Sequence, residues 1–416
     1  MHPHKFKNGN KRRLWEEINK AKGINGVRHL MRRLLSPGFR RAMVRFSPEF
    51  FLMYYIAFRL PKHQKRWVQL WAIQFLLELA PRDHGKSWIF SYGAPLYQIY
   101  SDLIENDLKF CKERFLQISK TDEMAAKYAD QVRETIMYNT WLAEDFGDIK
   151  DPDHWLKSYF SCRRERGDKL EKDHTYEKVG VLGGITGGHF NDINLDDPLD
   201  DENTKTTDRM DAIENWFFGT VWNLREPITR FRVVGTRKNR RDLYSTLLKS
   251  GIWKCNVEKA IIKYPMITDP KDPDRLVQGW LYKTDTGRHI RGMAEIKPEE
   301  TIVDVDLLTD DYQVLWPSSP KVDDEGKPKM APPVIDPDTG QVIMPSRQEL
   351  WGWGIKELLM DRLQGITTFE REKQNEITAG EEAIFHKDWM VYFDNDQLVY
   401  NETDGYTYLV TEVTQQ

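Results

Sequence analysis

A Gly-Lys-Ser tripeptide at residues 85–87 is the part of this chain best suited to chemistry. It ends the segment LLELAPRDHGKS, in which an apolar run enters a polar loop, the sequence form of a cradle for nucleoside triphosphates. Lys86 can reach the β- and γ-phosphate oxygens of ATP, the Ser87 hydroxyl can ligate Mg²⁺, and successive backbone N–H groups can wrap the phosphates. The residues expected to bind ATP in this loop are Ala80, Pro81, Arg82, Asp83, His84, Gly85, Lys86 and Ser87.

The loop departs from the usual pattern G-x-x-x-x-G-K-[ST], because Ala80 stands where the first glycine is expected. Backbone wrapping of the phosphates survives this change. A Gly-Lys-Ser tripeptide also occurs on ordinary solvated loops, so the motif needs structural context.

A pair of carboxylates about a hundred residues later supplies such context. In ITGGHFNDINLDDPLD, a short apolar run beginning at Phe190 ends in Asp196 and Asp197, and Pro198 then stops the strand. Ligands of an open α/β sheet sit at the carboxyl ends of its strands, so Asp196 is expected to support the Mg²⁺ and Asp197 to face the γ-phosphate. The alternative is an acidic turn, since Asp and Pro are common turn residues.

A third strand, in FRVVGTRKNRRDL, ends at Thr236. A threonine at the same sheet edge can sense the γ-phosphate and pass that information to the segment downstream. The alternative is a strand-to-helix turn in which Asp242 or Asn239 caps the helix DLYSTLLKS.

The elements that must position these residues alternate between apolar strands and amphipathic helices over residues 72–250. This alternation predicts an α/β fold with a mostly parallel central sheet flanked by helices. We expect Thr121 to cap a helix over residues 122–139, and residues 158–164 to form an edge or hairpin strand. The expected strands of the parallel sheet are Ile73–Leu79, Phe115–Ser119, Ile193–Asp196 and Arg232–Gly235.

Composition and charge fit a globular chain of 416 residues with 40% apolar residues. Residues 1–66 hold 17 Lys and Arg against 3 Asp and Glu, and the apolar spacing in residues 15–35 predicts a basic helical arm with a break at residues 36–38. Such an arm is expected to contact DNA or another subunit. The sequence shows neither a long apolar run nor a secretory h-region, and Cys111, Cys162 and Cys255 lack the spacing of a zinc site.

Together these motifs resemble the ATPase domain of the large terminase subunit of tailed double-stranded DNA phages. Arg82 matches the arginine inside that family's deviant phosphate loop, and Glu144-Asp145-Phe146-Gly147 resembles its acidic-aromatic turn. The stretches FCKERFLQISKTDEMAAKYADQVRETI, GVLGGITGGHFNDINLDDPLD, VVGTRKNRRDL, LWPS and ELLMDRLQGITTFEREKQNEI resemble the remaining family segments. The resemblance covers residues from about 60 to 376.

The resemblance implies a P-loop NTPase fold of the ASCE/RecA-like type, in an ATP-hydrolysing motor that moves double-stranded viral DNA into a preformed capsid. Expected cofactors are ATP and Mg²⁺. Expected partners are double-stranded DNA, the portal protein of the procapsid, the small terminase subunit and further copies of the chain in a ring, with no membrane. The place of action is the cytoplasm of the infected host cell, transiently at the portal vertex.

The resemblance also suggests roles for single residues. Asp197 is expected to orient the attacking water, Thr236 to couple hydrolysis to the downstream lid, and Arg82 to contact the γ-phosphate in cis. A trans arginine, from Arg237, Arg240 or Arg241 of a neighbouring subunit, is the alternative. Gln64, with His63 and Trp67, is a candidate for contact with adenine, although an aromatic residue at helical spacing is more often part of a core.

Four regions are expected along the chain. These are a basic arm over residues 1–50, an ATPase core over 51–250, a lid over 251–376 with an exposed insertion at 318–346 that turns at residues 338–340, and a tail over 377–416. Only about forty residues follow Ile377, fewer than the roughly fifty of a marginal domain, so no nuclease activity is expected despite Asp394, Asp396, Glu402 and Asp404.

Two other functions stay open at this point. One is a helicase-like or repair DNA-dependent ATPase, which would need a second ATPase-type domain. The other is a non-hydrolysing nucleotide-binding assembly protein with a degenerate phosphate loop.

Overall fold

The fold is taken from a computed structural model. It describes residues 23–157, 159–163, 174–185, 187–321, 327, 329–332, 334–335, 342–344, 347–377, 398–401 and 406–409. The first part of the predicted arm, the turn expected at residues 338–340 and the four acidic residues noted in the tail lie outside these ranges.

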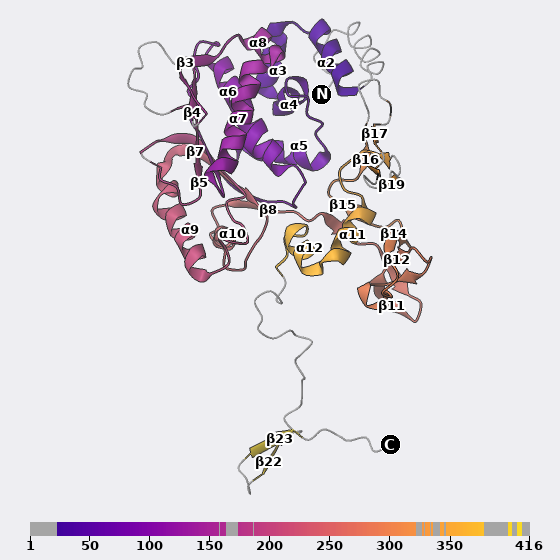
Figure 1. The fold of residues 1–416 in the computed structure, drawn as a ribbon. Helices are drawn as coiled ribbons and strands as arrows, with labels where there is room; N and C mark the ends of the chain where they lie inside the picture. The colour runs from indigo at the N-terminus through magenta and orange to yellow at the C-terminus, as the bar shows by residue number, and fades with distance from the viewer. Residues whose placement is uncertain are drawn as a thin grey trace.

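An eight-stranded sheet forms the centre of the described chain (Figure 1). Its strands lie in the order β3-β4-β5-β2-β6-β7-β1-β8, and the pairs from β5 to β8 are all parallel, whereas β3 and β4 join antiparallel. The strands are β1 (Phe75–Leu79), β2 (Phe115–Ser119), β3 (Lys150–Trp155), β4 (Tyr159–Cys162), β5 (Tyr176–Gly180), β6 (Phe190–Asp196), β7 (Arg225–Gly235) and β8 (Lys254–Val257). The predicted mostly parallel sheet is confirmed, with β1 starting two residues later and β6 and β7 starting earlier than expected.

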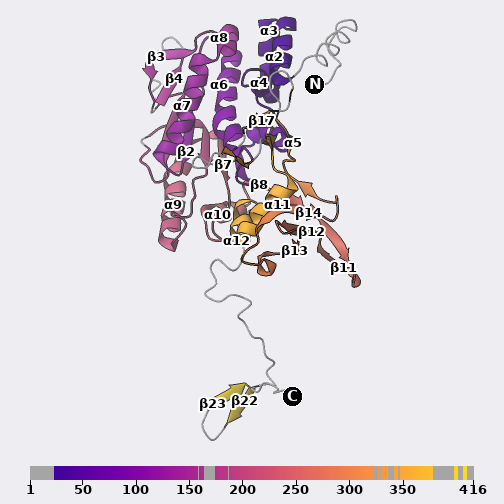
Figure 2. The ribbon, with the colours of Figure 1, turned by 45° about the vertical axis from the view of Figure 1, so that its right-hand side comes forward.

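Helices cover both faces of this sheet (Figures 1 and 2). Alternate strand residues point to opposite faces, so Leu76 and Val234 join one apolar core while Leu77 and Val233 join the other. The first face is covered by α4 (Pro48–Tyr54), α5 (Lys62–Gln69), η2 (Leu70–Ala72), the π-helix η3 (Trp88–Gly93), α6 (Ala94–Glu105), α7 (Asp122–Tyr138) and α8 (Thr140–Phe146). The second face is covered by α9 (Thr207–Gly219), η4 (Val221–Leu224) and α10 (Leu243–Lys249).

Several helices begin with a side-chain cap, and two of these caps were expected from the sequence. Ser36 caps α3 (Pro37–Phe46) and accepts from the backbone N–H of Phe39, so the predicted break is confirmed. Thr121 caps α7, and Asp242, rather than Asn239, caps α10 through the N–H of Ser245. Each side chain satisfies a backbone donor that the first helical turn leaves unpaired.

Basic residues in the described part of the arm bond within the chain. Arg28, on α2 (Gly23–Leu34), donates from Nε to the carbonyl of Tyr54 at 2.6 Å. Arg40, on α3, forms a buried ion pair with Asp145, 2.6 Å from Nε to Oδ2. These contacts attach α2 and α3 to the core, so the guanidinium groups of Arg28 and Arg40 are paired within the chain.

The region after residue 257 forms small antiparallel sheets around a third core. Its strands are β9 (Ile261–Lys263), β10 (Met266–Asp269), β11 (Asp272–Gln278), β12 (Trp280–Thr284), β13 (His289–Ile290), β14 (Ile302–Leu307), β15 (Gln313–Val314), β16 (Ser319–Pro320), β17 (Met330–Ala331), β18 (Val334–Ile335), β19 (Val342–Met344), β20 (Arg347–Gln348) and β21 (Leu350–Trp351). One 3₁₀ turn, η5 (Met293–Glu295), interrupts them, and β22 (Leu398–Asn401) pairs with β23 (Tyr406–Leu409) in the tail. β18 pairs antiparallel with β19, and the turn expected between them at residues 338–340 lies outside the described residues.

The sequence around residues 357–371 predicts a single helix, but the structure has two helices there. α11 (Ile355–Gln364) ends at Gly365, and α12 (Ile366–Glu372) begins directly after it. Gly365 has an extended backbone, φ −176° and ψ 97°, which interrupts the helical hydrogen bonds. Both helices contribute to the third core, through Leu358 and Leu359 of the first and Phe369 of the second. At the end of the second helix, the carbonyl of Glu372 accepts from the N–H of Arg82 in the loop after β1 at 2.9 Å.

Among the described residues, no helix is both long enough and apolar enough to cross a membrane. The boundaries proposed for arm, core, lid and tail stay predictions.

Candidate nucleotide site

The predicted phosphate loop, residues 80–87, leaves the carboxyl end of β1 and folds against helix α5. The carbonyl of His84 accepts hydrogen bonds from His63 Nε2 at 3.2 Å and from Gln64 Nε2 at 3.1 Å. Gly85 has a φ of +83°, and a Cβ there would overlap the side-chain amide of Gln64. Both facts favour glycine at this position, because a left-handed backbone is strained for most residues with a Cβ and the Gln64 amide would have to move to admit one.

Lys86 joins the three sequence motifs into one site. Its side chain is 5% exposed, and Nζ donates to Thr236 Oγ1 at 2.8 Å and lies 3.1 Å from Asp197 Oδ2. Thr236 follows β7 and Asp197 follows β6, the two strands that lie beside β1 on one side. The convergence follows from topology, since the carboxyl ends of parallel strands meet at one sheet edge.

Asp196 has the chemistry of a cation ligand. Both carboxylate oxygens are buried and have no hydrogen bond of normal length and angle with the described residues. Burial and the negative charge of Asp197 raise the pKa of Asp196 to about 6, while the nearby hydroxyls of Ser87 and Ser91 and the charge of Lys86 lower it. A buried carboxylate that lacks a well-formed hydrogen bond and lies near a serine hydroxyl fits Mg²⁺, a cation that prefers oxygen ligands, so Ser87 and Asp196 are the residues that would hold the ion.

Asp197, the ion-pair partner of Lys86, has a left-handed backbone conformation. Its φ is +43°, in the left-handed region that aspartate tolerates better than most residues, and its N–H donates to the carbonyl of Val234 at 2.9 Å. The side chain is 44% exposed, whereas that of Asp196 is buried. The two neighbouring acids therefore have different surroundings, one enclosed and one open to a ligand.

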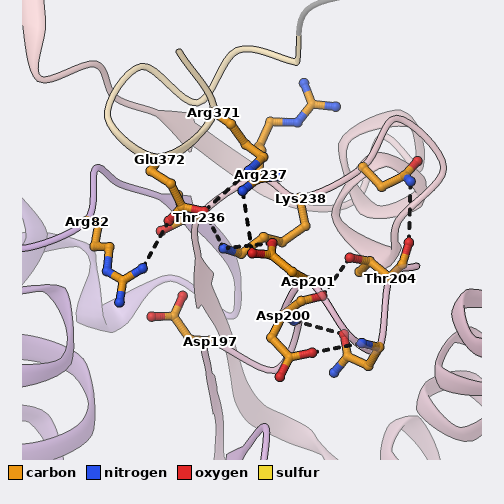
Figure 3. A network of polar contacts seen from close by, with 12 residues as sticks. Arg82, Asp197, Asp200, Asp201, Thr204, Thr236, Arg237, Lys238, Arg371 and Glu372 are labelled. Carbon is orange, nitrogen blue, oxygen red and sulfur yellow. Dashed lines mark hydrogen bonds and ion pairs between the residues drawn. The ribbon is translucent and has the colours of Figure 1, made fainter. Parts of the chain in front are cut away.

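Arg82 lies at the rim of the loop and faces a set of charges that no sequence motif indicated (Figure 3). Its side chain is 65% exposed, with Nη1 3.7 Å from the Glu372 carboxylate. The same carboxylate accepts from Lys238 Nζ at 2.5 Å and lies 3.3 Å from Arg371 Nε. Asp201, 3.7 Å from Lys238 and 3.5 Å from Arg371, completes this cluster.

The residues considered for adenine contact have different environments. Trp67 is fully buried, with its ring 4.8 Å from that of His63 and 6.1 Å from that of Phe90, so it belongs to the core. His63 and Gln64 support the loop through the His84 carbonyl. Burial lowers the pKa of His63 to about 4 and that of His84 to about 3, so both imidazoles are neutral at physiological pH.

The three arginines considered as trans donors also differ. Arg237 donates from Nη2 to Ser245 Oγ at 3.1 Å, so its guanidinium is engaged within the chain. Arg240 donates to the carbonyl of Ile377 at 3.4 Å, while the side chain of Arg241 is exposed. Contact with a neighbouring subunit stays a prediction for all three.

Strand order and site together define a P-loop NTPase fold of the ASCE/RecA-like type. The phosphate loop follows β1, and β7, carrying Thr236, lies between β1 and the acid-bearing strand β6. The fold class predicted from the sequence is therefore confirmed.

No protein-family model matches the chain, and neither does any curated protein sequence. Among solved structures, the chain is similar to the crystal structure of the HK97 bacteriophage large terminase, at 18% identity and a TM-score of 0.31, over 49% of this chain and 40% of that one. It is also similar to S. cerevisiae Dbp5 bound to Nup159, Gle1, IP6 and ADP, at 14% identity and a TM-score of 0.30, over 50% of this chain and 51% of that one. The chain thus spans about half, or less, of these two solved proteins. The fold class rests on strand order and site.

Proposed function

We propose that this protein hydrolyses ATP and uses the energy to move double-stranded viral DNA into a preformed capsid, as the ATPase domain of a large terminase subunit. The observation that carries the ATPase part is the meeting of Lys86 with Thr236 and Asp197, beside the buried carboxylate of Asp196. The packaging part is supported by the resemblance of the ordered motif set to that family.

In this proposal, the chain positions phosphates and supplies charge, which is how proteins accelerate phosphoryl transfer. Lys86 moves from Asp197 and Thr236 to the β- and γ-phosphate oxygens when ATP binds. Asp197, freed from that ion pair, orients the attacking water, and Thr236 senses the change. Arg82, exposed at the rim, contacts the γ-phosphate in cis.

Mg²⁺, held through Ser87 and Asp196, would neutralise phosphate charge in the bound state. DNA would be held mainly through its phosphates, so binding should be insensitive to sequence and weaken steeply with salt. In the assembled state, partners are the portal protein, the small terminase subunit and further copies of the chain.

The test is steady-state ATP turnover by the purified chain, with and without double-stranded DNA. Lys86→Ala and Asp197→Asn should each lower turnover by about 10²-fold or more, as expected when a preorganised charged group is removed. Lys65→Ala, which removes an exposed lysine of α5, is the matched control and should turn over normally.

The outcomes separate an ATPase from a binding protein. Turnover stimulated by DNA and lost in both site variants supports a DNA-dependent ATPase, which includes both the packaging motor and the helicase-like alternative. Nucleotide binding without turnover, with and without DNA and portal, would instead favour a non-hydrolysing assembly protein. Nicking of supercoiled plasmid with Mg²⁺ or Mn²⁺, absent from a matched inactive control, would contradict the expected lack of nuclease activity.

A further inference from the structure

Four consecutive polar residues, beginning with the last residue of helix α12, are buried beside the loop that follows β1. Glu372, Lys373, Gln374 and Asn375 are 7%, 7%, 2% and 3% exposed. Charged and amide side chains are seldom buried unless they are bonded, because burial removes their hydrogen bonds to water. We call residues 372–375 the polar strap, and its members contact three different parts of the chain.

The first two strap residues hold the phosphate loop. The carbonyl of Glu372 accepts from the N–H of Arg82 at 2.9 Å. Lys373 donates from Nζ to the carbonyl of Arg82 at 3.2 Å and to Asp83 Oδ2 at 3.1 Å. Lys373 also lies 3.8 Å from the ring centre of Trp353, whose Nε1 donates to the carbonyl of Asp83 at 3.3 Å. Asp83 has a φ of +65°, so these bonds stabilise a loop conformation that the residue itself disfavours.

The last strap residue holds the loop that follows Thr236. Asn375 Oδ1 accepts from the N–H of Arg237 at 3.1 Å, and Nδ2 donates to the carbonyl of Glu258 at 2.8 Å. The φ of Asn375 is +54°, which asparagine adopts more readily than most residues. One amide thus joins the Thr236 loop to the residue that follows β8.

Gln374, between these contacts, bonds to the lid. Its Nε2 donates to the carbonyl of Ile261 at 3.2 Å and to Tyr264 Oη at 2.8 Å, and its Oε1 accepts from the N–H of Ile261 at 3.1 Å. The strap therefore fastens the lid on one side and both nucleotide loops on the other.

We propose that the polar strap is a positioning element for the nucleotide site: Lys373 and Asn375 fix the phosphate loop and the Thr236 loop, and Gln374 ties both to the lid. The inference deepens the proposed function, because a strap that joins these parts transmits loop movement to the lid. Its members act through the loops rather than through contact with ATP.

The test compares two methionine variants of neighbouring strap residues. Lys373→Met keeps an aliphatic stem beside Trp353 but removes both bonds to the phosphate loop. Gln374→Met is the matched control, since it removes bonds to the lid alone. Hydrogen–deuterium exchange without nucleotide should be about tenfold faster in residues 80–87 of Lys373→Met than in the unaltered chain, and unchanged there in Gln374→Met, because one charge-assisted contact contributes on that order.

A second pair of variants tests Asn375. Asn375→Asp keeps the acceptor for the N–H of Arg237, whereas Asn375→Gly removes it and still accepts a positive φ. Exchange in residues 236–238 should rise in the glycine variant and stay low in the aspartate variant. Affinity for a non-hydrolysable ATP analogue should fall about tenfold in Lys373→Met and Asn375→Gly, but not in Gln374→Met, even where all three lower the melting temperature equally.

Equal effects of Lys373→Met and Gln374→Met on the phosphate loop would overturn the inference, because the strap would then be acting only through general stability. The hydrogen–deuterium exchange measurement is made without nucleotide. An unaltered chain that fails to bind or hydrolyse ATP would therefore contradict the proposed function and still leave the strap open to this test.

Discussion

Replacing Gly85 by alanine tests the geometry of the phosphate loop without any assumption about activity. The left-handed backbone, φ +83°, should cost about 1–2 kcal/mol once a Cβ is present. The new Cβ must also displace the Gln64 amide, which would lose its bond to the carbonyl of His84, a further cost of about 1 kcal/mol. Gly85→Ala should therefore lower the free energy of unfolding by about 2–3 kcal/mol.

A double-mutant cycle separates the two costs. Gln64→Ala alone loses the same hydrogen bond, about 1 kcal/mol. In the double variant that bond can be lost only once, so the summed costs of the single variants should exceed the cost of the double variant by about 1 kcal/mol. Urea unfolding of all four proteins gives the numbers. Strict additivity would refute the close contact between position 85 and Gln64, and a cost of Gly85→Ala below about 0.5 kcal/mol would refute the left-handed loop.

Three further predictions concern buried charge. Burial and the charge of Glu258 raise the pKa of Glu78 well above its ordinary value, so the folded state loses stability as the pH rises from the ordinary carboxyl range through the raised pKa. Glu78→Gln should therefore have a higher melting temperature than the unaltered chain at pH 8 but not at pH 4. An equal difference in melting temperature at both pH values would contradict this. The pKa of Asp196 is raised to about 6, and a protonated carboxyl does not bind a metal ion. The affinity of the unaltered chain for Mn²⁺, measured by titration, should therefore be about tenfold lower at pH 5 than at pH 7. An affinity that does not change with pH would show that Asp196 is not a metal ligand. Asp145→Asn breaks the buried pair with Arg40 and should cost about 3–5 kcal/mol in urea unfolding; a loss below about 1 kcal/mol would show that the pair does not hold the arm on the core.

The parts of the site that could be predicted from the sequence share one property. Asp196 ends an apolar strand, Asp197 and Thr236 each follow a strand directly, and Lys86 lies in the loop that leaves β1. Local pattern therefore identifies the strands, and topology then brings their carboxyl ends together. The caps were equally local, since Thr121 precedes its helix and bonds within it. Signals of this kind need only a few neighbouring residues.

The parts that were missed depend on contacts between distant residues. Glu372 and Lys373 lie about 290 residues after the loop they hold, and the run Glu-Lys-Gln-Asn reads as the solvated end of a helix. The break at Gly365 was missed for another reason, because a single glycine inside a helical pattern is usually tolerated. Trp67 was ambiguous, since helical spacing fits both a core position and a ligand contact.

The sequence predicts a role for Arg82 at the γ-phosphate, but it does not indicate the ion pair that Arg82 forms with Glu372. An arginine that serves the γ-phosphate in cis must be free to turn toward it, and a side chain that is 65% exposed has that freedom. Its nearest anion here is the Glu372 carboxylate, which Lys238 and Arg371 also approach, so Glu372 keeps two other cations when Arg82 leaves. When Arg82 moves from Glu372 to a phosphate, no buried carboxylate is therefore left unpaired, so the movement costs little free energy. Arg82→Ala should then lower turnover by about 10³-fold or more if the cis role holds, and near-normal turnover would assign that role to an arginine supplied in trans.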